Sequence, residues 1–330
     1  MNEDLTHPLI VLLGPTASGK TAVSIQLAGV LGGEIICADS RTVYRGMDIG
    51  TAKPTLSEQN GVPHWGLDLV APDERFTLYD FQQYVYRQID AIRARGHVPM
   101  LVGGSGLYID SIVHSYQLTE QAVDLAQRAA WEQLTVPELQ KIISERGLTL
   151  PADKLNKRRL VRTLELGGAR PPRQPRRRDA VVIGIWTDLP QLRQRMLQRA
   201  DAMLRDGLIS EVTQLLNKYG VQEPLKRNAY GVVRRYLAGE LTAAELPAAL
   251  ALGDYHLARK QLTFWRSPYR RDDIWWQSLA EVAALARAGV TAEQLFARLP
   301  DSFGGIISSE VARGALGVTC GLVKYFRQSV

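Results

Sequence analysis

Short apolar runs alternate with amphipathic stretches in the first half of the chain. Residues 8–13, 34–38, 98–102 and 180–186 are apolar runs that predict buried strands, and three of them end next to Gly or Asp. Between the second and third runs, Phe81, Val85, Ile89 and Ile92 recur with helical spacing and predict one buried helix face. Helices alternating with strands predict an α/β fold, with a parallel sheet that has helices on both faces.

The residues after 186 predict mostly helices. Leu192, Met196, Ala200 and Met203 repeat with helical spacing, and 243–265 is expected to form a helix interrupted at Pro247. We expect residues 116–150 to form a small helical insertion domain within a core made of residues 1–115 and 151–300. Residues 301–330 form a tail without clear periodicity, and no role is assigned to it.

The composition narrows the class of protein only slightly. A net charge of +6 and a pI of about 9.3 fit a polyanionic partner such as RNA, but many basic proteins have none. Two cysteines far apart in the sequence, Cys37 and Cys320, form neither a disulfide framework nor a zinc pattern. Without a membrane-spanning apolar stretch or a signal peptide, the chain is expected to be a cytoplasmic monomer that does not bind membranes.

A phosphate-binding motif lies between the first predicted strand and the helix that follows it. Its eight residues match G-x-x-x-x-G-K-[ST], and they are Gly14, Pro15, Thr16, Ala17, Ser18, Gly19, Lys20 and Thr21. The glycines let backbone N–H groups surround a phosphate at the helix N-terminus, Lys20 adds a full charge, and Thr21 offers its hydroxyl to Mg²⁺. The motif predicts a bound diphosphate or triphosphate, ATP included, without specifying the molecule. The alternative is a Gly-rich turn with a chance lysine.

Asp39 directly follows the second predicted strand. Ligands of open α/β sheets bind at the carboxyl ends of the strands, so this carboxylate is expected to face the phosphate site. An Asp that only caps the next segment is the alternative.

The sequence from Asp39 onward carries a family resemblance. Residues 39–54, D-S-R-T-V-Y-R-G-M-D-I-G-T-A-K-P, closely resemble the tRNA dimethylallyltransferases, whose pattern here is D-S-x-Q-x-Y-x-G-x-x-I-G-T-A-K. Similar blocks follow in order at 61–64, 102–108, 156–162, 192–212 and 258–266. Together with the P-loop they cover about residues 8–270.

The resemblance implies a fold and a reaction. The fold would be P-loop NTPase-like, and the P-loop would hold the diphosphate of dimethylallyl diphosphate together with Mg²⁺. The acceptor would be N6 of adenosine 37 in the anticodon stem-loop of tRNA, with Asp39 as general base, Ser105 near the reaction centre and Arg227 clamping the diphosphate. The residues implied to contact tRNA are Asp39, Ser40, Arg41, Thr42, Ser105, Arg158, Arg159, Leu160, Val161 and Arg162, and the insert at 116–150 would also contact it.

Ser105 stands where the family has Thr, and four further residues at three sites depart from the family pattern. Thr42 stands where the family has Gln, Trp65 replaces the second His of its P-H-H block, and Tyr230-Gly231 reverses its Gly-Tyr pair.

A basic segment supports an RNA partner independently of the resemblance. Residues 154–178 contain ten Lys and Arg but only one acidic residue, and the segment ends with Arg176, Arg177 and Arg178. Such a segment suits a phosphate backbone and predicts salt-sensitive binding. The alternative is a solvated basic face.

Other functions also fit part of the sequence. A small-molecule P-loop kinase accounts for the motif and for Asp39, which would hold a substrate hydroxyl, but not for the basic segment. A tRNA-binding protein of this family with weakened catalysis accounts for the blocks and the departures. An enzyme that prenylates free AMP or ADP remains a closer alternative.

Overall fold

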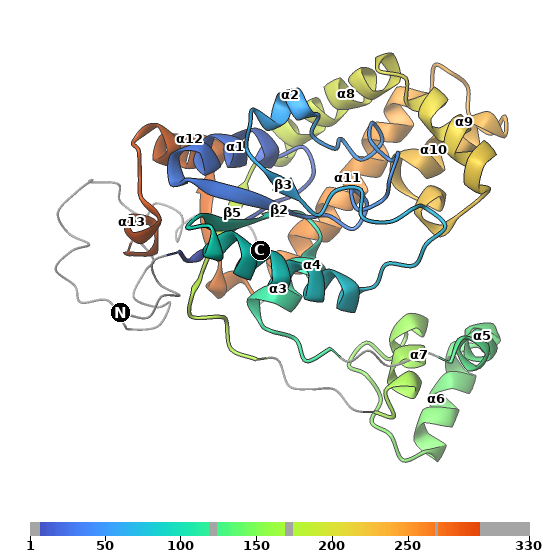
Figure 1. Cartoon of the computed structure of the whole chain (residues 1–330). Coiled ribbons are helices and arrows are strands. Elements are labelled where there is room, and N and C mark those ends of the chain that lie inside the picture. Colours follow the sequence, from blue (N-terminus) through green and yellow to red (C-terminus); the bar gives the residue numbers. More distant parts are fainter. Residues whose placement is uncertain (1–6, 119–123, 169–173, 268–269, 298–330) are drawn as a thin grey trace. The chain divides into compact units, whose positions relative to one another are not determined.

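The computed structural model describes residues 7–118, 124–168, 174–267 and 270–297 (Figure 1). The chain divides into two compact units, which we call the core unit (residues 1–113 and 176–330) and the insert unit (residues 114–175). Residues 151–175, grouped with the core in the sequence analysis, therefore belong to the insert unit. The tail at 301–330 lies outside the described residues.

A six-stranded sheet forms the centre of the core unit. Its strands are β1 (Leu9–Leu13), β2 (Gly33–Ala38), β3 (His64–Trp65), β4 (Val98–Gly103), β5 (Ala180–Trp186) and β6 (Trp275–Ser278). They lie in the order β3-β2-β4-β1-β5-β6, and every pairing is parallel. The predicted α/β class with a parallel sheet is therefore confirmed, and β3 and β6 are strands that the apolar pattern did not reveal.

The helices of the described residues connect or surround these strands. They are α1 (Lys20–Leu31), α2 (Leu56–Gln59), α3 (Leu78–Ala94), α4 (Gly106–Val113), α5 (Leu125–Gln133), α6 (Val136–Glu145), α7 (Lys157–Glu165), α8 (Leu189–Arg205), α9 (Leu208–Tyr219), η2 (Glu223–Lys226), α10 (Asn228–Leu237), α11 (Leu246–Trp265), η3 (Arg271–Asp273), α12 (Leu279–Arg287) and α13 (Ala292–Ala297). Pro247 lies in the first turn of α11, where its missing N–H costs no helical hydrogen bond, so it begins this helix instead of interrupting it.

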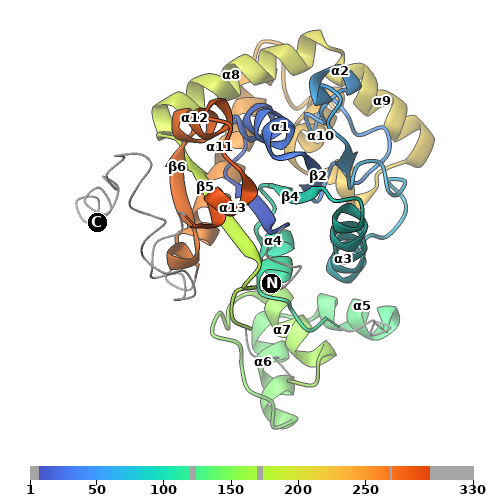
Figure 2. The same ribbon diagram turned by 60° about the vertical axis from the view of Figure 1, so that its left-hand side comes forward.

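Both faces of the sheet are covered by helices, as Figures 1 and 2 show for α1 and α12 on one side and α3 and α4 on the other. Successive strand residues point to opposite faces. Accordingly, Ile10 and Leu12 pack into the cluster under α1 and α12, while Leu9 and Val11 pack into the cluster that includes α3, α4 and the end of α11. Burial on both faces explains why the strands appear in the sequence as continuous apolar runs.

Two further apolar clusters organise the rest of the chain. In the core unit, α8, α9, α10 and the first half of α11 share a cluster that includes Met196, Val212 and Tyr230. The insert unit has its own small cluster, in which Trp131 of α5 packs with residues of α6 and α7. No described helix is long and apolar enough to cross a membrane.

A charged cluster fixes the edge of the sheet near β3. The Glu34 carboxylate is only 2% exposed and accepts hydrogen bonds from Trp65 Nε1 (2.7 Å), from Arg95 Nε and Nη2 (2.9 and 2.7 Å) and from His97 Nδ1 (2.6 Å). The bonds from Arg95 are the main reason that the pKa of Glu34 is lowered to about 2. Trp65, which departs from the family pattern, therefore has a structural partner here.

We expect Glu34→Gln to lower the free energy of unfolding by about 2–3 kcal/mol at pH 7, because a buried carboxylate with charged donors is replaced by a neutral amide. A lowered pKa means that this stabilisation is complete above pH 4.5, the ordinary value for Glu, and is lost as the pH falls towards 2. Urea denaturation at pH 7, 5 and 3.5 measures the difference. Glu240→Gln, which breaks an exposed ion pair with Arg235, is the control and should cost less than about 1 kcal/mol. An equal loss for both variants at pH 7 would contradict the assignment.

Candidate active site

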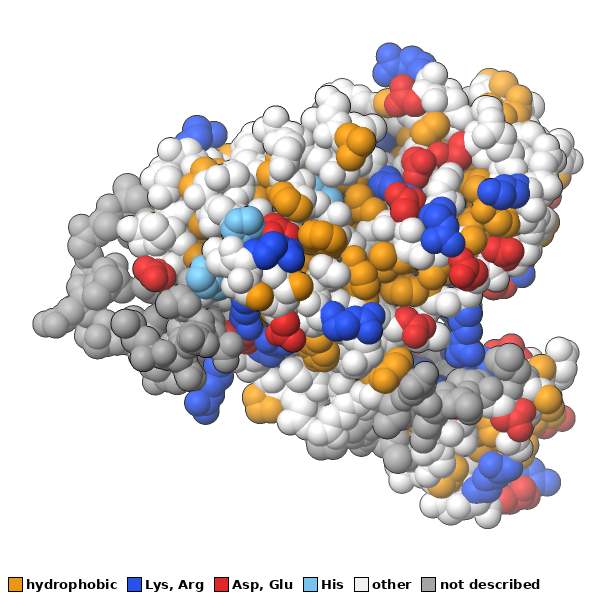
Figure 3. Space-filling view, in the orientation of Figure 1, with side chains coloured by type: hydrophobic (Ala, Val, Ile, Leu, Met, Phe, Trp, Pro, Cys, Tyr) orange, Lys and Arg blue, Asp and Glu red, His pale blue; other side chains and the backbone are white. Residues whose placement is uncertain are grey.

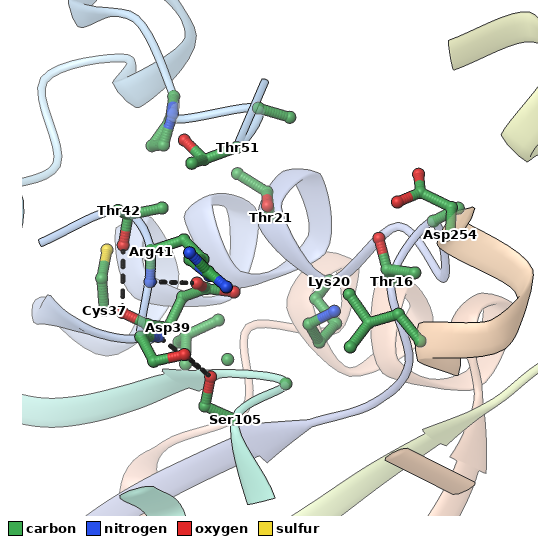
Figure 4. A pocket seen from close by; sticks show the side chains of 18 of the residues that line it. Thr16, Lys20, Thr21, Cys37, Asp39, Arg41, Thr42, Thr51, Ser105 and Asp254 are labelled. Carbon is green, nitrogen blue, oxygen red and sulfur yellow. Dashed lines mark hydrogen bonds between the residues drawn. The ribbon is translucent and has the colours of Figure 1, made fainter. Parts of the chain in front are cut away.

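A cavity of about 430 Å³ lies where β1, β2 and β4 end at their carboxyl side. Its walls come from segments far apart in the sequence, as Figure 4 shows for ten labelled residues. The lining residues fall within 16–24, 35–42, 50–54, 102–105 and 195–261, with His64 in addition. This is the place where parallel α/β sheets bind their ligands.

The motif residues 14–21 form a tight loop between β1 and α1, which we call the phosphate loop. Ala17 and Gly19 have left-handed backbone angles, with φ of 60° and 88°. A Cβ at Gly19 would lie 2.9 Å from Leu279 Cδ2, and one at Gly14 would lie 3.1 Å from the Ile185 carbonyl oxygen. Gly19 is therefore favoured by its left-handed backbone conformation, Gly14 lies in close contact with the Ile185 backbone, and the loop leads directly into the N-terminus of α1.

Lys20 lies at the centre of the site. Its Nζ donates a hydrogen bond to the Pro15 carbonyl oxygen (2.7 Å), so the ammonium group lies against the phosphate loop. Burial lowers the pKa of Lys20 to about 8, while the charge of Asp39 opposes the shift. The amine is still mostly protonated at pH 7 and is available to pair with an anion.

The residues around Thr21 fit a magnesium ion bound together with phosphates. Thr21 lines the cavity and provides a hydroxyl oxygen, which is the kind of ligand that Mg²⁺ prefers. Within the described part of the chain no three His, Cys, Asp or Glu side chains gather into a metal cluster. A site with one or two protein oxygens suits Mg²⁺, which usually completes its shell with water and substrate phosphates.

Hydrogen bonds connect Ser105 to Ser40, the residue that follows Asp39. Asp39 Oδ1 accepts from the Arg41 N–H (2.8 Å), which fixes the carboxylate in the turn after β2. Ser105 Oγ accepts from the Ser40 N–H (3.0 Å), and the two serine hydroxyls are 3.4 Å apart. Two predicted site residues from different strands are therefore brought together (Figure 4).

Gly103 allows the end of β4 to approach the end of β2 closely. A Cβ at this position would lie only 2.1 Å from the Ala38 carbonyl oxygen. The same oxygen accepts a hydrogen bond from the Ser105 N–H (3.2 Å). The end of β4 can approach the end of β2 only because position 103 has no side chain.

Arg41 and Thr42 lie next to Asp39 but are largely enclosed. Arg41 Nη1 donates to the Pro224 carbonyl oxygen (2.5 Å), and burial is the main cause of its lowered pKa. Thr42 is 6% exposed, and its hydroxyl is 3.5 Å from the Asp39 carbonyl oxygen. Both residues line the cavity, so any contact with an RNA would be made with a base that enters it.

Arg227 is not among the lining residues of the cavity. It is exposed and precedes α10, where it occupies the N-cap position. Its charge acts on Arg41, because it contributes to the lowered pKa of that guanidinium. The predicted clamp on the diphosphate therefore stays a prediction.

Two arginines that the sequence analysis did not select do contact the phosphate loop. On α8, Arg199 Nη1 donates to Thr16 Oγ1 (2.7 Å) and Arg195 Nη1 donates to the Ser18 carbonyl oxygen (3.3 Å). Asp254 of α11 faces Arg199, with 3.5 Å between the carboxylate and Nε. The charge of Asp254, like that of Asp39, opposes the burial that lowers the pKa of Lys20, so this carboxylate lies near the same cationic group.

The sequence contains only a weak signal for these residues. Arg195 and Arg199 are four positions apart, which places them on one face of a helix, but such pairs usually belong to a solvated surface. Asp254 and Gln261 lie two turns apart on α11 and also line the cavity. Only the packing of α8 and α11 against the phosphate loop shows that these polar side chains face inward.

Tyr230 explains the reversed Tyr-Gly order. Its ring is 1% exposed, and its hydroxyl donates to Glu211 Oε1 (2.6 Å). Glu211 also accepts from three backbone N–H groups at residues 48–50, and a Cβ at Gly50 would lie 2.6 Å from the Tyr230 ring. A Cβ at Gly231 would lie 2.6 Å from the Lys226 carbonyl oxygen, so the larger side chain fits only at position 230.

Two predicted tRNA contacts in the insert unit require correction. Leu160 is fully buried and Val161 is 2% exposed, and both belong to the apolar cluster of this unit. Their side chains stabilise α7 from the inside and are not available to an RNA.

The arginines on α7, in contrast, have exposed side chains. Arg158 and Arg159 are exposed, and Arg159 lies 3.9 Å from Asp153, too far for a strong pair. Arg162 pairs with Glu165 at 2.9 Å. An RNA backbone could therefore reach the exposed face of this helix through Arg158 and Arg159.

The three arginines after the insert unit differ from one another. Arg177 forms a salt bridge with Asp179 (2.8 Å), burial lowers the pKa of Arg176, and only Arg178 is plainly exposed. The preceding residues 169–173 lie outside the described residues. On the face of the core unit drawn in Figure 3, basic and acidic side chains are mixed, with no broad field of one sign.

The fold and the site together define a class of protein. A parallel sheet with a phosphate loop between β1 and α1, and a cavity at the strand ends, is P-loop NTPase-like. A family model described as IPP transferase matches residues 42–268, and the chain belongs to this family.

Curated relatives agree with this assignment. A tRNA dimethylallyltransferase of Desulforudis audaxviator is 39% identical over 290 residues, which cover 83% of this chain and 93% of that protein. A tRNA dimethylallyltransferase of Bacillus cytotoxicus is 35% identical over 295 residues, which cover 84% of this chain and 92% of that protein. The structure resembles the full-length tRNA isopentenylpyrophosphate transferase from Bacillus halodurans, with a TM-score of 0.66, 31% identity, and coverage of 88% of this chain and 97% of that one.

We expect Arg199→Met to weaken the binding of inorganic pyrophosphate about tenfold to a hundredfold, because one charged donor at the phosphate loop is removed. Calorimetric titration with pyrophosphate and Mg²⁺ measures the dissociation constant. Arg205→Met changes an exposed arginine on the last turn of the same helix and serves as the matched control. If Arg199→Met bound pyrophosphate as tightly as Arg205→Met, Arg199 would have no role in anion binding.

Proposed function

We propose that this protein transfers a dimethylallyl group from dimethylallyl diphosphate to N6 of adenosine 37 in tRNA. The observation that carries the proposal is the shared cavity, in which a phosphate loop and a fixed carboxylate, Asp39, face one another in a chain of the IPP transferase family. The names of the relatives support the same reaction.

The phosphate loop is suited to hold the diphosphate of the donor. Backbone N–H groups at the N-terminus of α1, the Lys20 ammonium and the guanidinium of Arg199 all stabilise negative charge. Charge on the leaving diphosphate grows in the transition state, so donors fixed beforehand lower the barrier. Mg²⁺, held by the Thr21 hydroxyl and by phosphate oxygens, would neutralise part of the same charge.

Asp39 is suited to act on the acceptor. The exocyclic amine of adenine is a poor nucleophile, because its lone pair is delocalised into the ring. As N6 forms a bond to C1 of the donor, the bond between C1 and the diphosphate oxygen breaks, and the N6 proton passes to the Asp39 carboxylate. The Arg41 N–H keeps that carboxylate in place.

The target adenine must leave the base stack to enter such a cavity. Unpaired loop bases do so at low cost, which favours an acceptor in the anticodon loop over one in a helix. The exposed arginines of α7 supply charge for the phosphate backbone of the same tRNA.

Two observations favour a second candidate function, a tRNA-binding member of the family with weakened catalysis. Arg227, the implied diphosphate clamp, lies outside the lining of the cavity, and Thr42 replaces the family's Gln next to the base. The small-molecule kinase alternative gains no comparable support.

The deciding measurement is mass spectrometry of nucleosides after incubation of unmodified tRNA with dimethylallyl diphosphate and Mg²⁺. We expect an adenosine that carries one dimethylallyl group. Asp39→Asn should reduce the rate on the order of 10²- to 10⁴-fold, because the proton acceptor is lost, while the affinity for tRNA stays unchanged.

Asp73→Asn, which changes an exposed carboxylate of the same unit, is the matched control and should keep the full rate. Binding of tRNA without any mass change in the wild-type protein would favour the second candidate. A near-normal rate for Asp39→Asn would remove Asp39 as the base.

We also expect the double variant Arg158→Gln/Arg159→Gln to reduce the salt dependence of tRNA binding. Each lost phosphate contact lowers the slope of log K against log [salt] by roughly 0.7–0.9, so the slope should fall by about 1.5. Titrations between 50 and 200 mM salt, roughly the range over which such effects are large, measure the slope. Lys141→Gln removes an exposed charge from α6 of the same unit and should leave the slope unchanged. An unaltered slope in the double variant would show that α7 does not contact the RNA backbone.

A further inference from the structure

The side chain of Gln261 connects the two halves of the candidate active site. Its Oε1 accepts a hydrogen bond from the Thr16 N–H of the phosphate loop (2.8 Å). Its Nε2 donates to the Gly104 carbonyl oxygen (3.0 Å), directly before Ser105. One amide group therefore bridges the donor-binding loop and the turn that carries Ser105.

This bridge requires an uncharged amide. A primary amide offers an acceptor and donors on the same planar group, whereas a carboxylate can only accept and a thioether does neither effectively. The orientation of the amide is fixed by its partners, since a backbone N–H can only donate and a carbonyl can only accept. A Cβ at Gly104 would lie 2.5 Å from Gln261 Nε2, so position 104 must be glycine for the bridge to form.

Contacts continue from this bridge to the candidate base. Ser105 follows Gly104, its hydroxyl accepts from the Ser40 N–H, and Ser40 is the neighbour of Asp39. Hydrogen bonds thus link Thr16 to Gln261, Gln261 to Gly104, and Ser105 to Ser40, and the peptide chain completes the connection from Gly104 to Ser105 and from Ser40 to Asp39.

Gln261 stands on a rigid part of the fold. It belongs to the last turns of α11, where Ala258, Leu262 and Trp265 are all buried. A side chain held by a packed helix positions its neighbours more precisely than one on a loop does.

We propose that Gln261 is a positioning residue that couples the occupied phosphate loop to the placement of Ser105 and Asp39. The proposal extends the proposed function, because the distance between the donor carbon and the acceptor amine depends on how these two loops are held. The coupling itself requires only that a diphosphate binds at the phosphate loop. A misplacement of reacting groups by about 1 Å reduces a rate on the order of 10²-fold.

The coupling is measured by hydrogen exchange, read by mass spectrometry, with and without inorganic pyrophosphate and Mg²⁺. In the wild-type protein we expect pyrophosphate to slow exchange at residues 14–21 and also at 39–42 and 103–107. In Gln261→Met the first effect should persist, while the slowing at 39–42 and 103–107 should be lost. Gln214→Met makes the same chemical change on an exposed face of α9 and should behave as the wild type.

Transfer kinetics provide a second readout. We expect Gln261→Met to lower kcat on the order of 10²-fold, with KM for donor and tRNA within about threefold of the wild type. Gln261→Glu keeps the acceptor for Thr16 but loses the donor to Gly104, and it adds negative charge beside the diphosphate. It should therefore lower kcat and also raise KM for the donor.

Defined results would overturn the proposal. Pyrophosphate that slows exchange at 103–107 equally in the wild type and in Gln261→Met would show that the bridge transmits nothing. The proposal would also fail if pyrophosphate slowed exchange in the wild type only at residues 14–21. If Gln261→Met melts too low for the exchange experiment, Gln261→Glu tests the same loss of the Gly104 bond.

The outcomes separate this proposal from the proposed function. Loss of coupling in Gln261→Met, together with a wild-type protein that prenylates no tRNA, would uphold the bridge and reject the transfer reaction. Transfer activity that survives in Gln261→Met at a near-normal kcat would uphold the reaction and reject the bridge.

Discussion

The site depends on how closely the ends of β2 and β4 approach one another. The Ala38 carbonyl oxygen occupies the space where a side chain at position 103 would begin, and it accepts the Ser105 N–H at the same time. Parallel strands bring their carboxyl ends to one edge of a sheet, but edge position alone leaves the side chains several ångströms apart. Because Gly103 has no Cβ, the two strand ends can approach closely enough for the Ser105 hydroxyl to bond Ser40, the residue next to Asp39.

The cavity at this edge of the sheet contains both cationic side chains, which attract an anion, and carboxylates, which reduce the net positive charge. Lys20, Arg195 and Arg199 bring positive charge to the phosphate loop, while Asp39 and Asp254 bring negative charge to the same cavity. Asp254 faces Arg199, and its charge partly opposes the burial that lowers the pKa of Lys20. Cations held by such partners are oriented before a ligand arrives, so less reorganisation is needed when it binds.

The sequence predicts the sheet and part of the site, for reasons that differ from residue to residue. Four strands and the phosphate loop are recognisable because local pattern determines them, since strands buried on both faces must be apolar and a tight loop must contain glycine. The short strand β3 and the tryptophan-containing β6 have too little pattern of their own to be recognised. Arg195, Arg199 and Gln261 lie in blocks that resemble the family, but their roles escape prediction because the phosphate-loop atoms that they contact are more than 150 residues away in the sequence. For Leu160 and Val161 the prediction of an RNA contact is wrong. The block that contains them combines exposed arginines with apolar residues that pack inside the insert unit.

The reversed order of Tyr230 and Gly231 has a consequence for how such a sequence can change over time. A side chain at position 231 collides with the Lys226 carbonyl oxygen, and the ring at position 230 fills the space beside Gly50. If position 231 becomes Tyr first, its side chain collides with the Lys226 carbonyl oxygen. If position 230 becomes Gly first, the space beside Gly50 is empty and Glu211 loses the Tyr230 hydroxyl but keeps its three backbone N–H donors. Each of the two positions therefore limits the other: a side chain at position 231 requires the backbone at Lys226 to move, and a smaller residue at position 230 leaves the space beside Gly50 unfilled.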